Sequence, residues 1–130
     1  MADAAVPGPS LDGILITEHE GYWELGLRPT PSFPKVMRQL QEVRVFCKDK
    51  KPARLMLDLR GIIGTFTVTD RYELGSFGGS LQGLVGRVAV IAQPEFIDPE
   101  KFGVQVAQNR GLNVDVFTSA EAALGWLLGS

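Results

Sequence analysis

The chain has 130 residues, 45% of them hydrophobic, and this length suits one domain whose core needs neither a disulfide nor a metal for stability. Its formal net charge is −2 and its thirteen Lys and Arg residues are spread along the sequence, so we expect no nucleic-acid partner. No apolar run approaches the roughly 18 residues of a membrane span, and the single cysteine, Cys47, suits a reducing compartment, so we expect a cytoplasmic protein without a membrane span.

The beginning of the chain divides into a leader and a hairpin. Residues 1–10 contain two prolines, a glycine and an aspartate, and predict a flexible leader ahead of one α/β domain over residues 11–130. Two short apolar segments, residues 13–17 and 22–27, are separated by a short turn that contains a glycine, and this spacing predicts an antiparallel hairpin. The only histidine, His19, falls in the predicted turn, so we expect it at the surface.

The first predicted helix starts near Ser32, which can cap it, with Pro34 in its first turn. Its apolar residues recur at spacings of three and four and predict one buried face: Val36, Met37, Leu40, Val43 and Phe46. The polar residues between them are expected to point outward: Lys35, Arg38, Gln39, Glu42 and Lys48. Cys47 lies near the helix end with lysines close by, which can lower the pKa of a thiol, but a structural or surface cysteine is the preferred interpretation.

The middle of the chain predicts two buried strands joined by a helix. Residues 54–61 and 87–92 are nearly continuous in apolar side chains up to their ends, as expected for central strands covered on both faces. Between them, Thr67 or Thr69 can cap a helix. Glycines in the second half of this helix predict either flexibility or close packing.

The end of the chain predicts one more strand between two helices. A helix begins at Asp98 with a proline after it and stops at Gly111, and a strand follows over residues 114–117. Thr118 and Glu121 then form a capping box for the last helix. The whole order predicts a single-domain α/β sandwich: a mixed, mostly parallel sheet of about five strands, with an N-terminal antiparallel hairpin and about four helices.

Several segments together resemble a known family. They are Leu57-Asp58-Leu59-Arg60-Gly61, Asp70-Arg71-Tyr72-Glu73-Leu74, Arg87-Val88-Ala89-Val90, Asn109-Arg110-Gly111, and Val116-Phe117 followed by Ala123-Leu124-x-Trp126-Leu127. Their order and spacing resemble the SpoIIAA-like family of the STAS/SEC14 group over about residues 11 to 128. The resemblance implies a small α/β sandwich related to anti-sigma factor antagonists and similar in outline to the lipid-binding CRAL-TRIO fold. Most members of that family have no assigned biochemical role, so the resemblance supports the fold more than a function.

The chain departs from true anti-sigma factor antagonists at their phosphorylation site. Those proteins carry an Asp-Ser pair at the start of the helix after the third strand, whereas this chain has Gly64-Thr65-Phe66-Thr67 there. Thr65 and Thr67 are the possible phosphorylation sites, because a phosphate at a helix N-terminus gains from the free N–H groups and the dipole. The preferred interpretation of Thr67 is a helix cap.

Polar residues after neighbouring parallel strands predict a ligand crevice, since the carboxyl ends of such strands meet at one edge of the sheet. The candidate ligand-binding residues are Asp58, Arg60, Gly64, Thr65 and Phe66, with Gln93 after the next strand. An Asp, an Arg and free N–H groups suit a small polar or phosphorylated ligand, with Phe66 and Phe96 as apolar walls. The preferred interpretation of Asp58 and Arg60 is that they pair with each other or with neighbouring helix ends, because charges at strand ends commonly satisfy local backbone groups.

Two functions follow from these residues. The first is a non-catalytic, STAS-like regulatory or protein-interaction module, with an unidentified protein partner and a possible homodimer. The second is a small-ligand carrier for a lipid-like or nucleotide-like molecule, under a roof formed by residues 66–77. We expect no catalytic residues, no cofactor and no metal, because the chain has no catalytic or metal-ligand constellation. A cavity of roughly 300 Å³ or more would favour the carrier.

Overall fold

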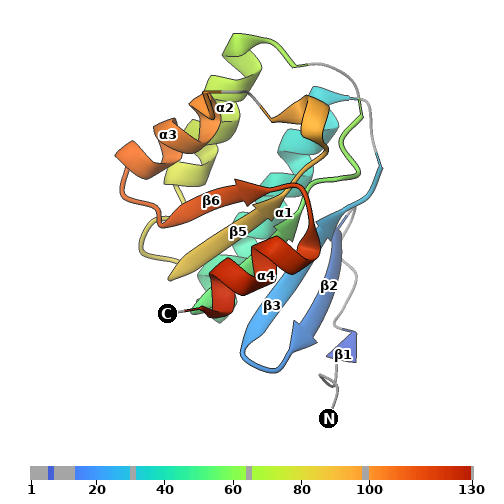
Figure 1. The fold of residues 1–130 in the computed structure, drawn as a ribbon, viewed down its shortest axis with the longest axis vertical. Helices are drawn as coiled ribbons and strands as arrows, with labels where there is room; N and C mark the ends of the chain where they lie inside the picture. Colours follow the sequence, from blue (N-terminus) through green and yellow to red (C-terminus); the bar gives the residue numbers. More distant parts are fainter. Residues whose placement is uncertain (1–5, 8–13, 30–31, 64–65, 98–99, 130) are drawn as a thin grey trace.

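The structure, a computed structural model, describes residues 6–7, 14–29, 32–63, 66–97 and 100–129. Its elements in chain order are β1 (Val6–Pro7), β2 (Ile14–His19), β3 (Tyr22–Leu27), α1 (Phe33–Lys50), β4 (Arg54–Asp58), α2 (Val68–Gly79), β5 (Arg87–Ile91), the 3₁₀ helix η1 (Pro94–Phe96), α3 (Phe102–Asn109), β6 (Val114–Phe117) and α4 (Ala120–Leu128). Figure 1 shows one sheet with helices on both of its faces.

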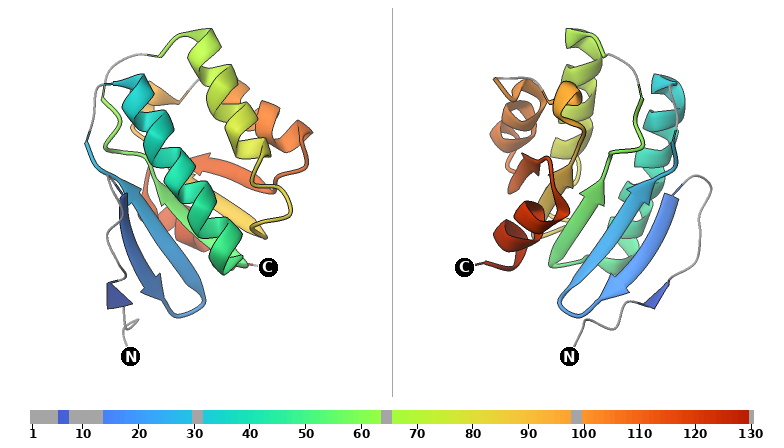
Figure 2. Two further views of the ribbon diagram at one scale, coloured as in Figure 1. Left: turned by 180° about the vertical axis from the view of Figure 1, so that it is seen from behind. Right: turned by 45° about the vertical axis from the view of Figure 1, so that its right-hand side comes forward.

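The strands lie in the sheet in the order of the sequence, from β1 to β6. The pairs β1–β2 and β2–β3 are antiparallel, and the later pairs are parallel. Three right-handed crossovers that all step the same way place α1, α2 and α3 on one face, and α4 covers the other (Figures 1 and 2). The predicted α/β fold, with its mixed sheet, hairpin and four helices, is confirmed.

The predicted leader contains a strand that the sequence analysis did not foresee. Val6 and Pro7 form β1 and pair with Glu18 and Thr17 of β2. A proline suits such a position because an edge strand leaves one row of backbone groups unpaired. The other residues of the predicted leader lie outside the described residues.

The core has two parts, one on each face of the sheet. In β4, Leu55 and Leu57 pack toward α1, α2 and α3, whereas Met56 packs toward α4 beside Ala89 of β5. All four side chains are buried. The prediction of central strands covered on both faces is therefore confirmed, because alternate residues of one strand point to opposite faces.

Helix α1 starts as predicted but buries one residue that was expected outside. Ser32 Oγ accepts a hydrogen bond from the backbone N–H of Lys35, and a proline occupies the first turn. Gln39, predicted to point outward, is buried. Its Oε1 accepts a hydrogen bond of 2.9 Å from the backbone N–H of Arg28. The side chain thus satisfies a backbone donor in the connection between β3 and α1, which offsets the cost of burying an amide.

Two other helix starts differ from the predicted pattern. Helix α4 is capped by Ser119, whose Oγ accepts from the backbone N–H of Ala122 over 3.1 Å, so the predicted cap at Thr118 is wrong. The reason is that β6 stays paired through Phe117, whose carbonyl accepts from Ala92, and the chain needs a further residue to turn. Helix α3 begins after Lys101, and the predicted cap at residues 98–99 lies outside the described residues.

The predicted end of α3 is confirmed at Gly111, which has a φ of +99°. The backbone N–H of Gly111 donates to the carbonyl of Gln108, and that of Leu112 donates to Ala107. This pair of bonds satisfies the last carbonyls of a helix when the residue after the cap adopts the left-handed conformation, which glycine does without strain. The turn then directs the chain into β6.

Candidate functional site

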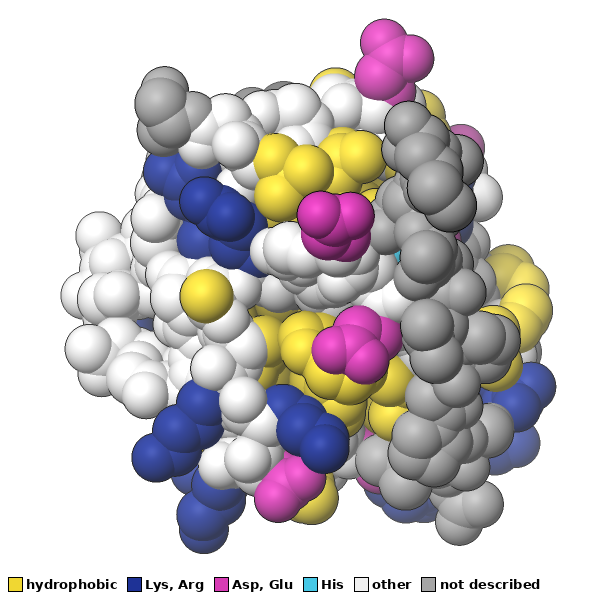
Figure 3. Space-filling view, turned by 90° about the horizontal axis from the view of Figure 1, so that it is seen from below, with side chains coloured by type: hydrophobic (Ala, Val, Ile, Leu, Met, Phe, Trp, Pro, Cys, Tyr) yellow, Lys and Arg dark blue, Asp and Glu magenta, His cyan; other side chains and the backbone are white. Residues whose placement is uncertain are grey.

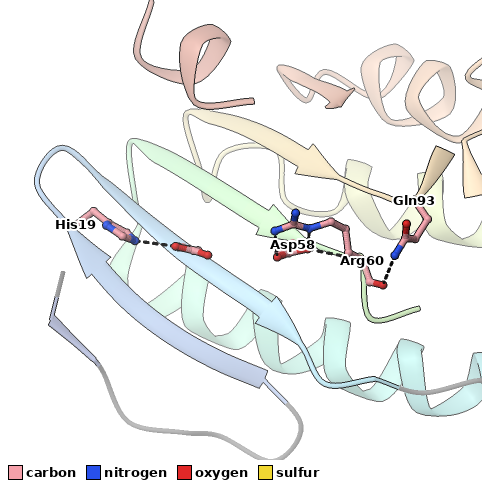
Figure 4. A network of polar contacts seen from close by, with 5 residues as sticks. His19, Asp58, Arg60 and Gln93 are labelled. Carbon is pink, nitrogen blue, oxygen red and sulfur yellow. Dashed lines mark hydrogen bonds and ion pairs between the residues drawn. The ribbon is translucent and has the colours of Figure 1, made fainter. Parts of the chain in front are cut away.

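The predicted polar crevice starts at the end of β4, where Asp58 and Arg60 bind each other (Figure 4). Arg60 Nε donates to Asp58 Oδ1 over 3.0 Å, and Arg60 Nη2 donates to Oδ2 over 2.9 Å. The backbone N–H of Arg60 also donates to Oδ1. Burial by itself raises the pKa of Asp58, but the hydrogen bonds and charge of Arg60 outweigh it and lower that pKa below its usual value. The pairing given as the alternative to ligand binding is therefore present.

Gln93, which follows β5, joins this pair. Its Nε2 donates to the carbonyl oxygen of Arg60 over 3.4 Å. The structure thus brings together Asp58, Arg60 and Gln93, as expected for residues that follow neighbouring parallel strands. A ligand at this edge of the sheet would have to compete with the bidentate Asp58–Arg60 pair, and ligand binding by these side chains stays a prediction.

The other predicted ligand-binding residues do not extend this polar group. Gly64 and Thr65 lie outside the described residues. Phe66 is buried, and its ring makes edge-to-face contacts with Phe33 at 5.1 Å and Phe96 at 4.9 Å between ring centroids. These three rings come from the start of α1, the residue before the α2 cap and η1. Phe66 and Phe96 therefore pack against each other as parts of the core.

Thr67 has the capping role that the sequence analysis preferred. Its Oγ1 accepts from the backbone N–H of Asp70 over 3.0 Å, and the Asp70 carboxylate accepts from the backbone N–H of Thr67 over 3.0 Å. Together these bonds form the capping box of α2. Phosphorylation of Thr67 stays a prediction, and a phosphate on this hydroxyl would replace the existing cap.

His19 lies in a different place from the one predicted. It is the last residue of β2, outside the turn, and its side chain is only 13% exposed. Nε2 lies 2.7 Å from Glu24 Oε1, and the ring stacks on Tyr22 with centroids 4.4 Å apart. The expected surface histidine is therefore wrong, because the turn is only two residues long and the histidine remains paired within the sheet. Figure 4 shows the His19–Glu24 pair on the sheet beside the Asp58–Arg60 pair.

The structure contains an apolar cavity on the opposite face of the sheet from α4. We name it the α2–α3 cavity, and its volume is about 140 Å³. Its apolar side chains come from α1, β4, α2, β5, η1, α3, β6 and the residues that follow β4, α2, η1 and α3: Leu40, Leu57, Leu59, Leu74, Phe77, Leu81, Val88, Val90, Phe96, Ile97, Val104, Ala107, Leu112, Val114 and Val116. Leu74 and Val90 are only half-buried. A central strand such as β5 normally has its apolar side chains fully covered, so the space above Val90 is not filled by the chain itself.

Close contact between α2 and α3 accounts for the position of this roof. A Cβ on Gly75 would lie 2.5 Å from the carbonyl oxygen of Gly103, and one on Gly79 would lie 2.4 Å from Arg110 Cδ. The predicted alternative of close packing is therefore the correct one for these glycines. Figure 2 shows α2 and α3 side by side above the β5 and β6 end of the sheet. The two helices are therefore in direct contact through these glycines.

Sequence reasoning anticipated the roof of this cavity but not its floor. The predicted roof, residues 66–77, includes most of α2, whose side chains Leu74 and Phe77 line the space. The signal that could have located it is the pairing of glycines on two successive helices, Gly75 and Gly103. Val90 and Val116, which line the cavity from the sheet, give no sequence signal for it, because their periodicity is that of any buried strand.

A second, open hollow lies between α1 and α2. It has a volume of about 490 Å³ and mixed lining: Met37, Gln41, Arg44, Tyr72, Glu73, Ser76, Phe77 and Ser80. Tyr72 is 47% exposed there. We name this hollow the α1–α2 groove. It is a surface feature, in contrast to the apolar α2–α3 cavity.

The remaining candidate residues supply no reactive site. Cys47 is fully buried, and this burial raises the pKa of its thiol to about 12, so the structural interpretation is confirmed and a thiol activated by the nearby lysines is excluded. Within the described ranges, no cluster of three or more His, Cys, Asp or Glu side chains could hold a metal ion. None of the helices described is both long enough and apolar enough to cross a bilayer.

Charge on the face drawn in Figure 3 is mixed. Lys and Arg side chains stand in separate groups, with Asp and Glu side chains and hydrophobic patches between them. Binding to the phosphate backbone of a nucleic acid requires several cations along one surface. The visible part of this face offers no such continuous row.

Comparisons with known proteins add no identity to this geometry. No protein-family model matches the chain, and no curated protein matches it at a significant level. The resemblance to the SpoIIAA-like family therefore stays a prediction, and the function must be argued from the structure.

Proposed function

We propose that this protein is a non-catalytic binding protein for a small apolar molecule, held in the α2–α3 cavity. The observation that carries the proposal is the space of about 140 Å³ between the sheet and the α2–α3 pair, walled by aliphatic and aromatic side chains. Apolar cavities of about 150 Å³ stay dry and take up molecules such as benzene. The proposed site lies beneath α2 instead of at the Asp58–Arg60 pair, and its volume is below the roughly 300 Å³ that would favour a carrier of a lipid-like or nucleotide-like molecule.

The side chains that line the α2–α3 cavity lack packing partners on one side, because the chain leaves this space unfilled. A ligand that fills the space restores the missing contacts and removes its own apolar surface from water. Both effects favour binding of a molecule whose shape matches the cavity.

The size of the cavity limits the ligand. The volume of about 140 Å³ is below the roughly 300 Å³ of a site for a full-sized ligand. A six-membered ring or a short branched chain fits, whereas a nucleotide or a long acyl chain does not. The space is partly open to solvent, and α2, which forms one of its walls, has three glycines within its twelve residues, which lower its intrinsic helix stability.

An NMR titration with toluene tests the proposal. We expect toluene to shift the backbone amide signals of α2, α3 and β5 saturably, and Val90→Phe to weaken binding at least about tenfold by filling the space. Val45→Phe is the matched control, because Val45 is 63% exposed on α1, and it should bind toluene like the natural chain. If Val90→Phe does not fold, Val104→Phe fills the cavity from α3. Absence of saturable shifts in the natural chain would overturn the proposal.

The regulatory or protein-interaction module remains a second candidate. It is favoured by the α1–α2 groove, which presents the half-exposed Tyr72 beside polar side chains of both helices. Aromatic side chains at the centre of a surface hollow are typical anchors of protein interfaces. The protein partner, the homodimer, the cytoplasmic location and the absence of a nucleic-acid partner all stay predictions.

A further inference from the structure

One edge of the sheet is formed by β6, the last strand in the sheet order. The edge of a sheet offers backbone groups with which a strand of another molecule can pair. We infer that Lys101, Gln108 and Asp115 close the β6 edge to such a strand, and that the partner they exclude is a strand of a second copy of this chain. The inference goes beyond the proposed function and does not depend on a ligand in the α2–α3 cavity.

The pairing of β6 with β5 shows which backbone groups of β6 face outward. The carbonyl of Phe117 accepts a hydrogen bond from the backbone N–H of Ala92, the residue after β5. The backbone groups of successive residues in a strand point alternately to its two sides. The N–H and C=O groups of Val114 and Val116 therefore face away from β5, and they are the groups that an added strand would bond.

Side chains of this chain already bond two of these outward groups. Gln108 of α3 donates from Nε2 to the carbonyl oxygen of Val114 over 2.8 Å. Asp115 Oδ1 accepts from the backbone N–H of Val116 over 2.8 Å. An added strand would have to displace both side chains before it formed its own bonds, so its net gain in hydrogen bonding would be small.

The ion pair of Lys101 with Asp115 crosses the edge from one face of the sheet to the other. Lys101 precedes α3 and lines the α2–α3 cavity, on the face where Val114 packs. Asp115 alternates with Val114 and belongs to the α4 face, where Phe117 packs. Lys101 Nζ lies 3.1 Å from Asp115 Oδ1, the oxygen that also accepts from Val116. A strand added about 4.8 Å from β6 would meet this pair and remove its charges from water.

The opposite edge of the sheet is protected in another way. The edge strand β1 has two residues, and one of them is Pro7. Short edge strands and prolines both oppose the addition of a further strand. The β6 strand has four residues and no proline, so side chains must provide its protection.

The test removes two of these side chains together, in the double variant Gln108→Ala with Asp115→Ala. Sedimentation velocity measures self-association over a range of protein concentrations. We expect association at a concentration at least about tenfold lower than for the natural chain, because two backbone groups become available to a pairing strand. Concentration-dependent NMR shifts of the Val114 and Val116 backbone amides should locate the contact at β6.

Two controls separate edge pairing from other causes of association. Gln105→Ala with Asp49→Ala removes the same two types of side chain at exposed positions of α3 and α1 and changes the net charge equally. Thr67→Ala removes the cap of α2 and lowers stability without touching β6. Both controls should associate no more than the natural chain.

The outcomes decide the inference. It is overturned if the double variant associates no more than the controls, or if the concentration-dependent shifts lie outside β6. If the double variant does not fold, Lys101→Ala takes its place, since it removes the ion pair across the edge and leaves both backbone bonds intact. We expect Lys101→Ala to associate at a concentration at least about threefold lower than the natural chain does. No such change would overturn the inference.

Discussion

At the scale of single residues, the Asp58–Arg60 pair connects protonation to stability. The pKa of Asp58 is lower in the folded protein than its ordinary value, with Arg60 as the cause of the lowering. A carboxylate whose pKa is depressed on folding stabilises the fold at pH values above its unfolded-state pKa. That stabilisation is lost as the pH falls through the lower, folded-state pKa. Stability falls as the pH falls because the unfolded chain binds the proton on Asp58 more tightly than the folded chain does.

Replacement of Arg60 should therefore have a pH-dependent effect. We expect Arg60→Met to lower the free energy of unfolding most near neutral pH and progressively less below about pH 4, where Asp58 takes up a proton. Urea unfolding from about pH 7 to about pH 3 measures this. Arg54→Met, which replaces an exposed arginine at the start of β4, serves as the control. A loss of the same size at every pH would contradict the assigned coupling.

The cap of α4 gives a second prediction at this scale. Ser119→Ala removes the hydroxyl that accepts from Ala122 and should lower the free energy of unfolding by about 1 kcal/mol. Thr118→Ala, one residue earlier, removes no cap and should change stability by much less. Chemical denaturation of the two variants compares them directly. Equal losses would show that both hydroxyls contribute to the start of the helix.

At the scale of elements, the α2–α3 contact depends on the absence of side chains. A Cβ on Gly75 meets the Gly103 carbonyl oxygen at 2.5 Å, whereas one on Gly125 of α4 meets nothing within 4 Å. The two glycines are both inside helices. They therefore form a matched pair in which helix propensity is the same and packing differs.

Alanine at these two glycines should have opposite effects. Gly75→Ala should destabilise the protein by about 2 kcal/mol, because backbone at that distance cannot give way without separating the helices. Gly125→Ala should stabilise it by about 0.5 to 1 kcal/mol through helix propensity alone. Thermal unfolding of both variants tests the pair. A stabilised Gly75→Ala variant would show that α2 is not in close contact with α3.

The elements also show which features a sequence can predict. The caps at Ser32 and Thr67 were predictable because donor and acceptor lie three residues apart and no tertiary contact is needed. Thr118 and Ser119 are neighbouring hydroxyl residues that both satisfy the pattern, and only the length of β6 decides between them. Gln39 was misplaced because its partner, Arg28, lies eleven residues away in the chain.

At the scale of the whole molecule, the fold was more predictable than the site. Alternating apolar segments and helix signals imply the mixed sheet, since crossovers have a fixed hand. Pairing of Asp58 with Arg60 was one of the expected arrangements, because charges at strand ends commonly satisfy local groups. The α2–α3 cavity was not, because its volume depends on the distance at which two helices stand from the sheet, and hydrophobic periodicity contains no such distance. The contacts of α2 with Gly103 and Arg110 are likewise tertiary and have no counterpart in that periodicity.

The agreement between strand order and sequence order, from β1 to β6, has a consequence for synthesis on the ribosome. From β2 onward, each strand that emerges finds one hydrogen-bonding neighbour already made. The three helices of one face emerge in the same succession, and α4, made last, covers β4, β5 and β6. The sheet can therefore grow outward in one direction during translation, with short loops to close at each step.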